Sequence, residues 1–283
     1  MAWVRTCAER SGGVVSRAEL EAFAPDGHPL KLVDHSRGIR NPRELSATIS
    51  VMHNPSGPYD DQVDTSGGLL RYAYRSARTD SDNRKLREAG RLGLPIILLR
   101  KIADGVFVPV CPVYVVEDRP DEACFMLAVD ESLRVISDGR ELDEHARRYA
   151  ERLTRTRLHQ PVFRARVLRA YREVCAMCRL KHVTLLDAAH ILADGHLKGH
   201  AVVSNGISLC KIHHAAFDQN ILGVRPDLVV EVRADILEEF DGPMLRHGLQ
   251  EMAGVRLQQP VRPQERANSE ALEERYAEFR ASA

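Results

Sequence analysis

The chain has 283 residues, no formal net charge, 44% hydrophobic residues and 28% charged residues. These values are typical of a globular protein of one large or two ordinary domains, and they exclude a largely disordered chain. No stretch is apolar over the length needed to cross a bilayer, and the first ten residues lack the apolar run of a secretory signal. We therefore expect a cytoplasmic protein of two domains that contacts no membrane.

The segment from about residue 33 to residue 130 is rich in strand-forming sequence. Short apolar or β-branched runs, separated by turn residues, occupy residues 47–52, 69–74, 94–102, 105–116 and 123–129. Between them, S-D-N-R-K-L-R-E-A-G-R-L-G-L-P predicts a helix that ends at Gly93 and Pro95. The pattern predicts a sheet or barrel in a first domain, residues 1–140.

An arginine-rich helical pattern begins after about residue 138, and we place the domain boundary at residues 138–144, with a second domain at 141–283. Residues 146–172 contain nine arginines and a single acid. Such a run can bind phosphates even in a neutral protein, because counterion release depends on the charges at the contact. The alternative is a solvated helix face. We expect Pro161 to break or restart the helix. The expected contacts to the DNA backbone are Arg155, Arg157, Arg164 and Arg166.

Three of the six cysteines lie close together in the second domain. In a reducing compartment such a cluster indicates a metal site rather than disulfides. Cys175 and Cys178 are spaced C-x-x-C, and Cys210 and His213 are spaced C-x-x-H. Each pair can form a tight turn that places two ligands on one tetrahedral ion, so we predict a structural Zn²⁺ site. The alternative is a set of unrelated thiols and a surface histidine.

The residues around the cysteines predict a ββα order. V-T-L-L-D-A-A-H-I and I-S-L-C are strand-like, and K-I-H-H-A-A-F-D-Q-N is helix-like. Residues four apart share a helix face, so His214 and Asp218 are expected to point the same way while His213 turns about 100° aside toward the zinc. The two adjacent histidines can therefore serve two different metals.

This region resembles the HNH nuclease family, whose ββα-metal core carries a histidine at the end of the first strand, an asparagine in the loop and a histidine on the helix. The resemblance extends from Q-P-V-F-R-A-R-V-L-R-A-Y-R-E-V-C to H-H-A-A-F-D. It implies that His190 is the general base, that Asn205 holds the loop and orients the base, and that His214 binds a catalytic divalent cation, Mg²⁺ or Mn²⁺.

One position departs from the family pattern. Many HNH members carry a metal-binding Asp or His directly before the base, where this chain has Ala189. A replacement ligand is expected from Asp218, one helical turn after His214, or from Asp187 on the first strand. The alternative for Asp218 is an ordinary carboxylate on the helix surface.

The first domain carries G-P-Y-D-D-Q-V-D-T-S-G-G-L-L-R-Y-A-Y, followed by the predicted helix and the basic strand P-I-I-L-L-R. These motifs resemble the SRA (YDG) domain, a PUA-like curved β-barrel that flips 5-methylcytosine out of the duplex. The resemblance implies that Tyr59 and Tyr72 stack on the base and that Asp61, or Asp64 in the same turn, accepts a hydrogen bond from its amino group. The alternative is that the tyrosines are barrel aromatics and the acids are turn residues.

Together the two halves predict an α+β protein, with an SRA-like barrel followed by a zinc-containing HNH domain. The expected function is that of a type IV, modification-dependent restriction endonuclease, which binds double-stranded DNA containing 5-methylcytosine or a related base and cuts nearby. Each HNH centre cuts one strand at a time, so a homodimer is expected. Two alternatives remain: a methyl-DNA binding protein that does not cut, and a nuclease whose first domain is a general DNA clamp.

Overall fold

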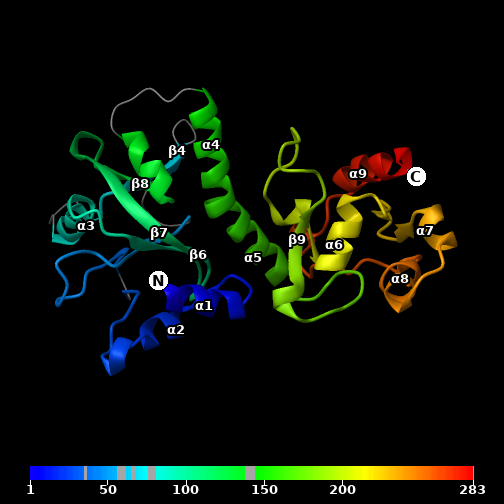
Figure 1. Ribbon diagram of the computed structural model, residues 1–283, viewed down its shortest axis with the longest axis horizontal. Coiled ribbons are helices and arrows are strands. Elements are labelled where there is room, and N and C mark those ends of the chain that lie inside the picture. Colours follow the sequence, from blue (N-terminus) through cyan, green and yellow to red (C-terminus); the bar gives the residue numbers. More distant parts are fainter. Residues whose placement is uncertain (35–36, 56–61, 65–67, 76–80, 138–143, 283) are drawn as a thin grey trace. The chain divides into compact units, whose positions relative to one another are not determined.

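The computed structural model describes residues 1–34, 37–55, 62–64, 68–75, 81–137 and 144–282. The chain divides into two compact units, Met1–Val162 and Phe163–Ala283 (Figure 1). Each unit has buried apolar clusters of its own, so each is described by itself.

The first unit is a sheet with short helices. Its strands are β1 (Val15–Ser16), β2 (Ile39–Arg40), β3 (Ser50–His53), β4 (Gln62–Asp64), β5 (Leu69–Ala73), β6 (Ile96–Ala103), β7 (Val106–Arg119) and β8 (Cys124–Ala128). Its α-helices are α1 (Ala2–Arg10), α2 (Arg17–Ala22), α3 (Ser81–Arg91) and α4 (Glu144–Thr154), and α5 (Gln160–Ala170) begins at its end. The predicted strands and the predicted helix at 81–95 are therefore present.

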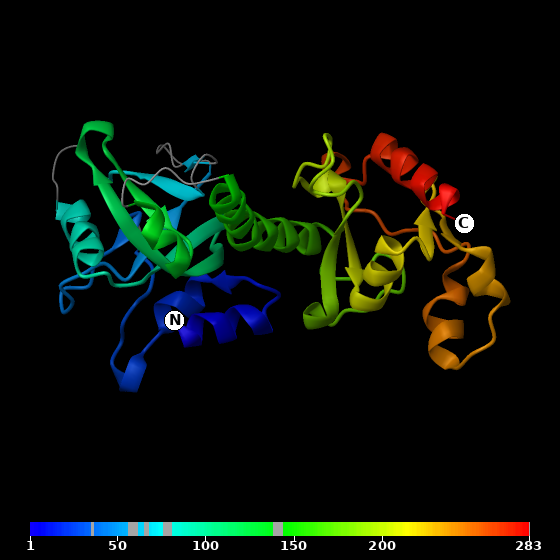
Figure 2. The ribbon, with the colours of Figure 1, turned by 45° about the horizontal axis from the view of Figure 1, so that its top comes forward.

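The strands form one mixed sheet in the order β2-β3-β6-β7-β8-β5-β4, with β1 paired to β7. The pair β3–β6 is parallel and the other pairs are antiparallel. The long strand β7 pairs with β6 through its first half and with β8 through its second half. The register shifts twice in the first pairing, between Ile96 and Leu98 and between Lys101 and Ala103, and once in the second, between Val115 and Glu117. Such irregularities bend strands and increase their twist, and the sheet curls into a half-barrel (Figure 2).

Both faces of this sheet are covered, as alternate side chains of β6 show. Ile96 and Leu98 belong to the buried cluster that also contains Leu86 of α3. Their neighbours Ile97 and Leu99 belong to a second cluster, which contains residues of α1 and α2. Because successive strand residues point to opposite faces, α3 lies on one face and the N-terminal helices on the other.

The arginine-rich segment differs from its prediction at Pro161. A π-helical turn at Arg155–His159 joins α4 to α5, and both Thr154 and Gln160 keep helical dihedral angles. The Gln160 N–H reaches back to the carbonyl of Arg155. The helix therefore continues, because Pro161 stands in the first turn after the π-bulge, where its missing N–H costs little. Ala150 and Leu158 are buried in the first unit, so this unit extends beyond the predicted boundary at 138–144.

The second unit contains two strand pairs and several helices. Its elements are β9 (Leu186–His190), β10 (Gly206–Cys210), α6 (Lys211–Asp218), β11 (Leu222–Val224), β12 (Val230–Val232), α7 (Ala234–Glu238), α8 (Pro243–Gly248) and α9 (Ser269–Ala281). Strands β9 and β10 are antiparallel and lead directly into α6, which is the predicted ββα order. One buried cluster joins the start of α5, the two strands, α6 and α9. None of the helices in the described part of the chain has the length and apolar character that crossing a bilayer requires.

Candidate metal and catalytic centres

The structure brings the four predicted zinc ligands together. The Sγ atoms of Cys175 and Cys210 each lie 3.4 Å from His213 Nδ1, and the Sγ of Cys178 lies 4.0 Å from that of Cys210. All four ligand atoms lie within 4.8 Å of one another. Ligands about 2.3 Å from a tetrahedral Zn²⁺ are about 3.8 Å apart, so the donor set and its spacing fit a structural zinc ion.

The hydrogen bonds of the cluster prepare it for a cation. His213 Nε2 donates to the carbonyl of Gly248 at 2.8 Å, which directs Nδ1 toward the thiols. Hydrogen bonds from Cys178 and then Cys210 lower the pKa of the Cys175 thiol, and the hydrogen bond to Cys175 raises the pKa of Cys178. The three thiols are thus partly deprotonated, and a bound cation would displace their remaining protons.

The proposed base, His190, ends β9 and faces Gly206 across the strand pair. Its Nε2 atom is buried and has no hydrogen-bond partner among the described residues. Burial lowers the pKa of His190; the charge of Asp194 opposes this shift and that of His214 adds to it. The imidazole is therefore neutral at neutral pH, which is the form that can accept a proton. Asp194 was not predicted, because a loop acid four residues after a histidine has no distinctive spacing.

Asn205 is buried, and its amide holds the loop between the two strands. Its Oδ1 accepts from the Leu192 N–H at 3.0 Å, and its Nδ2 donates to the carbonyls of Leu192 at 3.0 Å and His200 at 3.1 Å. Both amide protons are used in these contacts. Asn205 therefore ties together the backbone of the loop that follows His190.

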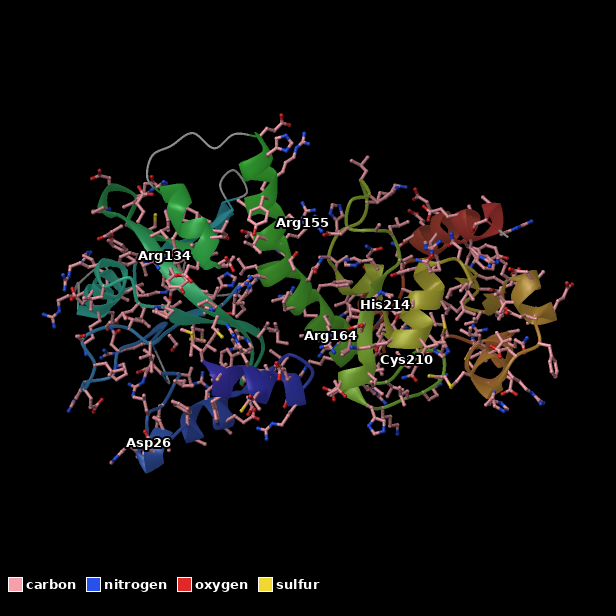
Figure 3. All side chains as sticks on the ribbon, viewed as in Figure 1. Asp26, Arg134, Arg155, Arg164, Cys210 and His214 are labelled. Carbon is pink, nitrogen blue, oxygen red and sulfur yellow. The ribbon has the colours of Figure 1, made fainter. Side chains whose placement is uncertain are left out.

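His214 lies between the two carboxylates predicted as alternative ligands. Its Nδ1 is 3.8 Å from Asp187 Oδ2, and its Nε2 is 3.4 Å from Asp218 Oδ2. The two acids thus meet opposite nitrogens of the ring. Arg164 on α5 (Figure 3) already binds Asp187, with Nε 3.2 Å from Oδ1. The Asp218 side chain is instead 55% exposed. A cation on Nε2 would therefore find a carboxylate that is open to solvent.

The four arginines predicted to contact DNA divide into two pairs. Arg157 binds the carboxylate of Asp130 at 2.6 Å, and Arg164 also donates to the carbonyl of Leu186 at 2.7 Å. These two guanidinium groups therefore bind other groups of the same chain. Arg155 and Arg166 are exposed.

The residues predicted to bind a flipped base are described only in part. Tyr59 and Asp61 lie outside the described residues, as does the side chain of Asp64, whose backbone is in β4. Tyr72 is fully buried, its hydroxyl donates to the Gly38 carbonyl at 2.9 Å, and the Arg75 guanidinium lies 3.9 Å from its ring centroid. The Tyr72 ring has no exposed face on which a base could stack, which favours the alternative interpretation of this residue as a core aromatic.

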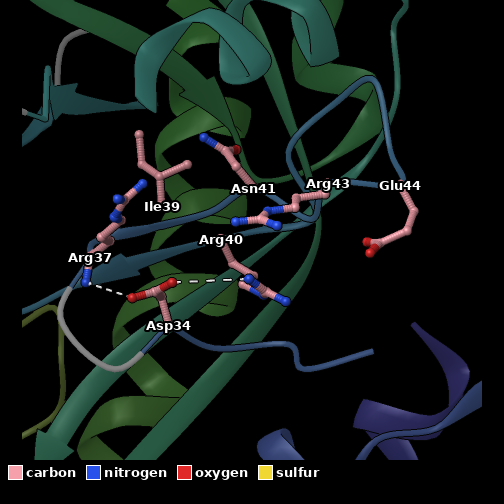
Figure 4. Close-up of a pocket in the computed structure, with 7 residues that line it drawn as sticks. All are labelled: Asp34, Arg37, Ile39, Arg40, Asn41, Arg43 and Glu44. Atoms are coloured by element: carbon pink, nitrogen blue, oxygen red, sulfur yellow. Dashed lines mark hydrogen bonds and ion pairs between the residues drawn. The ribbon is translucent and has the colours of Figure 1, made fainter. Parts of the chain in front are cut away.

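A cavity of about 380 Å³ opens on the first unit (Figure 4). Its lining consists of Asp34, Arg37, Ile39, Arg40, Asn41, Arg43 and Glu44. Arg37 binds Asp82 at 3.1 Å, and Arg40 lies 4.0 Å from Asp34. Acids of the same unit thus pair with two of the three arginines that line the cavity.

Comparison with known families assigns the class of the second unit. Residues 175–225 match the family model described as HNH endonuclease. This range contains the four zinc ligands, His190, Asn205, His214 and both candidate carboxylates. The chain thus carries an HNH endonuclease domain and is an endonuclease.

Two solved structures are similar to the chain at low identity. One is described as a modification-dependent TagI restriction endonuclease, with 16% identity, a TM-score of 0.33 and coverage of 86% of this chain and 85% of the other. The second is the type IV phosphorothioation-dependent restriction endonuclease ScoMcrA, with 15% identity, a TM-score of 0.23 and coverage of 88% of this chain and 52% of the other. No curated protein matches the chain.

Proposed function

We propose that the protein is a modification-dependent DNA endonuclease, in which the first unit selects double-stranded DNA with a modified cytosine and the second hydrolyses the backbone. The observation that carries the hydrolytic part is the state of His190. Burial keeps its imidazole neutral, and the ring lies within electrostatic reach of His214 and Asp218. A neutral imidazole beside a cation-binding pair is what phosphodiester hydrolysis requires.

In this proposal His190 removes a proton from the attacking water. Asn205 keeps the base in place by holding the loop at Leu192, and it stays in the same contacts throughout the reaction. The second unit would hold a Mg²⁺ or Mn²⁺ ion at His214 Nε2 and Asp218. Such an ion would neutralise the phosphate and stabilise the departing oxygen.

Asp218 is the better candidate for the ligand that Ala189 cannot supply. Asp187 is neutralised by Arg164, and breaking that pair would leave a partly buried guanidinium without its carboxylate. The described residues contain no further group of three His, Cys, Asp or Glu side chains that could hold an ion besides the zinc cluster. Two protein ligands would leave the remaining positions to water and phosphate, as is usual for Mg²⁺.

The role of the first unit rests on its sequence motifs. The Y-D-D-Q-V-D run and the strand P-I-I-L-L-R resemble an SRA reader, and the curled sheet provides a scaffold of the required kind. We propose that Asp61 or Asp64 accepts a hydrogen bond from the pairing edge of the flipped cytosine and that Tyr59 stacks on one face of the base. Because one HNH centre cuts one strand, we further propose that a homodimer makes the double-strand break.

The decisive experiment compares plasmids that are identical except that their cytosines are unmodified, methylated or hydroxymethylated. Each is incubated with Mg²⁺ or Mn²⁺ and the purified protein, and nicks and linear products are counted. The variant His190→Ala tests the base, and His182→Ala is its matched control, because His182 is an exposed histidine of the same unit. We expect cutting of modified DNA by the wild type and the control, and binding without cutting by His190→Ala.

The outcomes separate the two halves of the proposal. Equal cutting of all three plasmids would reject the modified-base reader and leave a nuclease with a general DNA clamp. Undiminished cutting by His190→Ala would reject the catalytic centre. Selective binding of modified DNA without cutting by the wild type, with either cation, would make the protein a reader that does not cut.

A further inference from the structure

The ring of Phe163 lies flat on the imidazole of His190. The ring centroids are 4.0 Å apart and the planes are inclined by only 14°. Phe163 is 3% exposed and belongs to the buried cluster of the second unit, on α5. The stack therefore joins His190 to a helix that is distant from it in the sequence, since α5 precedes all three zinc cysteines.

The fit depends on the absence of a side chain at position 206. Gly206 faces His190 across the strand pair. A Cβ atom at this position would lie 2.5 Å from Val167 Cγ2 and 2.9 Å from Phe163 Cζ. Tyr171, one turn further along, donates from its hydroxyl to the Gly206 carbonyl at 3.3 Å. The glycine thus allows α5 to lie close to the strand end, which places the Phe163 ring against the base.

Little else determines the orientation of this imidazole. The strand fixes the Cα and Cβ of His190, but the torsion that turns a histidine ring is broad and roughly two-fold. In many functional sites a hydrogen bond to the second ring nitrogen sets that torsion. Here the described residues provide no hydrogen bond to Nε2, which is buried. The stacked Phe163 ring is a contact that can set the plane of the imidazole.

We propose that Phe163 is a positioning residue for the His190 base: its ring sets the plane of the imidazole and keeps water from one of its faces. This inference rests on the proposed role of His190 as the base. A ring that turned freely would present its lone pair to the attacking water in only part of its orientations, so turnover would fall while DNA binding stayed the same. Phe163 acts through His190 and does not touch the substrate.

The test compares Phe163→Leu with Val167→Ala. Leucine keeps the site apolar but has no flat face, and Val167 packs against the same glycine without stacking on the histidine. Both proteins are first checked for zinc content and thermal unfolding. We expect Phe163→Leu to lower kcat for nicking modified DNA on the order of two- to tenfold, the factor that corresponds to the energy of a stacked ring pair, with KM unchanged. Val167→Ala should stay within about twofold of wild type.

A double-mutant cycle shows whether the effect passes through the base. In a His190→Ala background, Phe163→Leu should not lower the residual rate further. The proposal is overturned if Phe163→Leu and Val167→Ala have the same kcat. It is also overturned if Phe163→Leu lowers the rate by the same factor in the His190→Ala background as in the wild type. If leucine impairs folding, Phe163→Met replaces it, because methionine is flexible and fills the space without a flat face. Wild-type cutting by His190→Ala alone would instead refute the base itself.

Discussion

Replacing Cys175 with serine should destabilise the second unit and leave the first unit intact. Cys175 is fully buried, and its sulfur lies 3.4 Å from His213 Nδ1 across 38 residues of chain. The cluster therefore ties the turn after α5 to α6. Through the bond from His213 to the Gly248 carbonyl it also holds the end of α8. Serine would remove one zinc ligand and leave a hydroxyl in a buried site.

The size of the effect follows from the free energy of zinc binding. Structural zinc contributes about 10–16 kcal/mol in small domains, so one ligand of four accounts for about 2.5–4 kcal/mol. The net stability of a domain is only about 5–15 kcal/mol. For a unit of this size a loss of about 3 kcal/mol lowers the melting temperature by about 10 °C or more.

Calorimetry of the whole chain, together with metal analysis, can measure this change. We expect about one zinc per chain in the wild type and two unfolding transitions, because the two units have separate buried clusters. Cys175→Ser, or a strong chelator, should lower only the transition of the second unit. The matched control is Cys124→Ser, a buried thiol of the first unit. A metal-free wild type, or a Cys175→Ser protein as stable as the wild type, would refute the zinc assignment.

Three further predictions concern the catalytic centre. Burial lowers the pKa of His190 below 6.5, so nicking should decline only when the pH falls through that lowered pKa. An acidic limb of the pH–rate profile at or above pH 6.5 would contradict the burial argument. Asn205→Ala removes three hydrogen bonds, so it should lower the free energy of unfolding of the second unit by about 3 kcal/mol and reduce the nicking rate. Unchanged stability would show that other contacts hold the loop. Asp218→Asn should raise the Mg²⁺ concentration needed for half-maximal nicking by about tenfold or more, and Asp187→Asn should raise it less. A larger increase in Asp187→Asn would assign the ligand to Asp187.

The sequence was most informative where the signal is local. The spacings C-x-x-C and C-x-x-H predicted a cluster that the structure assembles, because each spacing places two ligands on one tight turn. The ββα order followed from short periodic patterns, and helical geometry alone placed His214 and Asp218 on one face. The continuation of the helix through Pro161 was missed, because a π-helical turn has no sequence signature at the level of propensity.

Interactions between distant segments could not be predicted in this way. The burial of Tyr72 under Arg75 depends on packing within the first unit, and the same residues could equally belong to an open pocket. The pairing of Arg164 with Asp187, which distinguishes the two candidate ligands, joins α5 to β9. The bond from His213 to Gly248 uses a backbone carbonyl, which no side-chain pattern reveals.

The amino-acid sequence by itself determined which chemical groups are available and which of them share a turn, a strand or a helix face. Tertiary structure alone decided how the two histidines of the proposed catalytic centre are oriented: Phe163 lies flat on His190, and each nitrogen of His214 faces a different carboxylate. The physical reason is that backbone hydrogen bonds and residue spacing act over a few residues, whereas the plane of a ring is set by whatever packs against it.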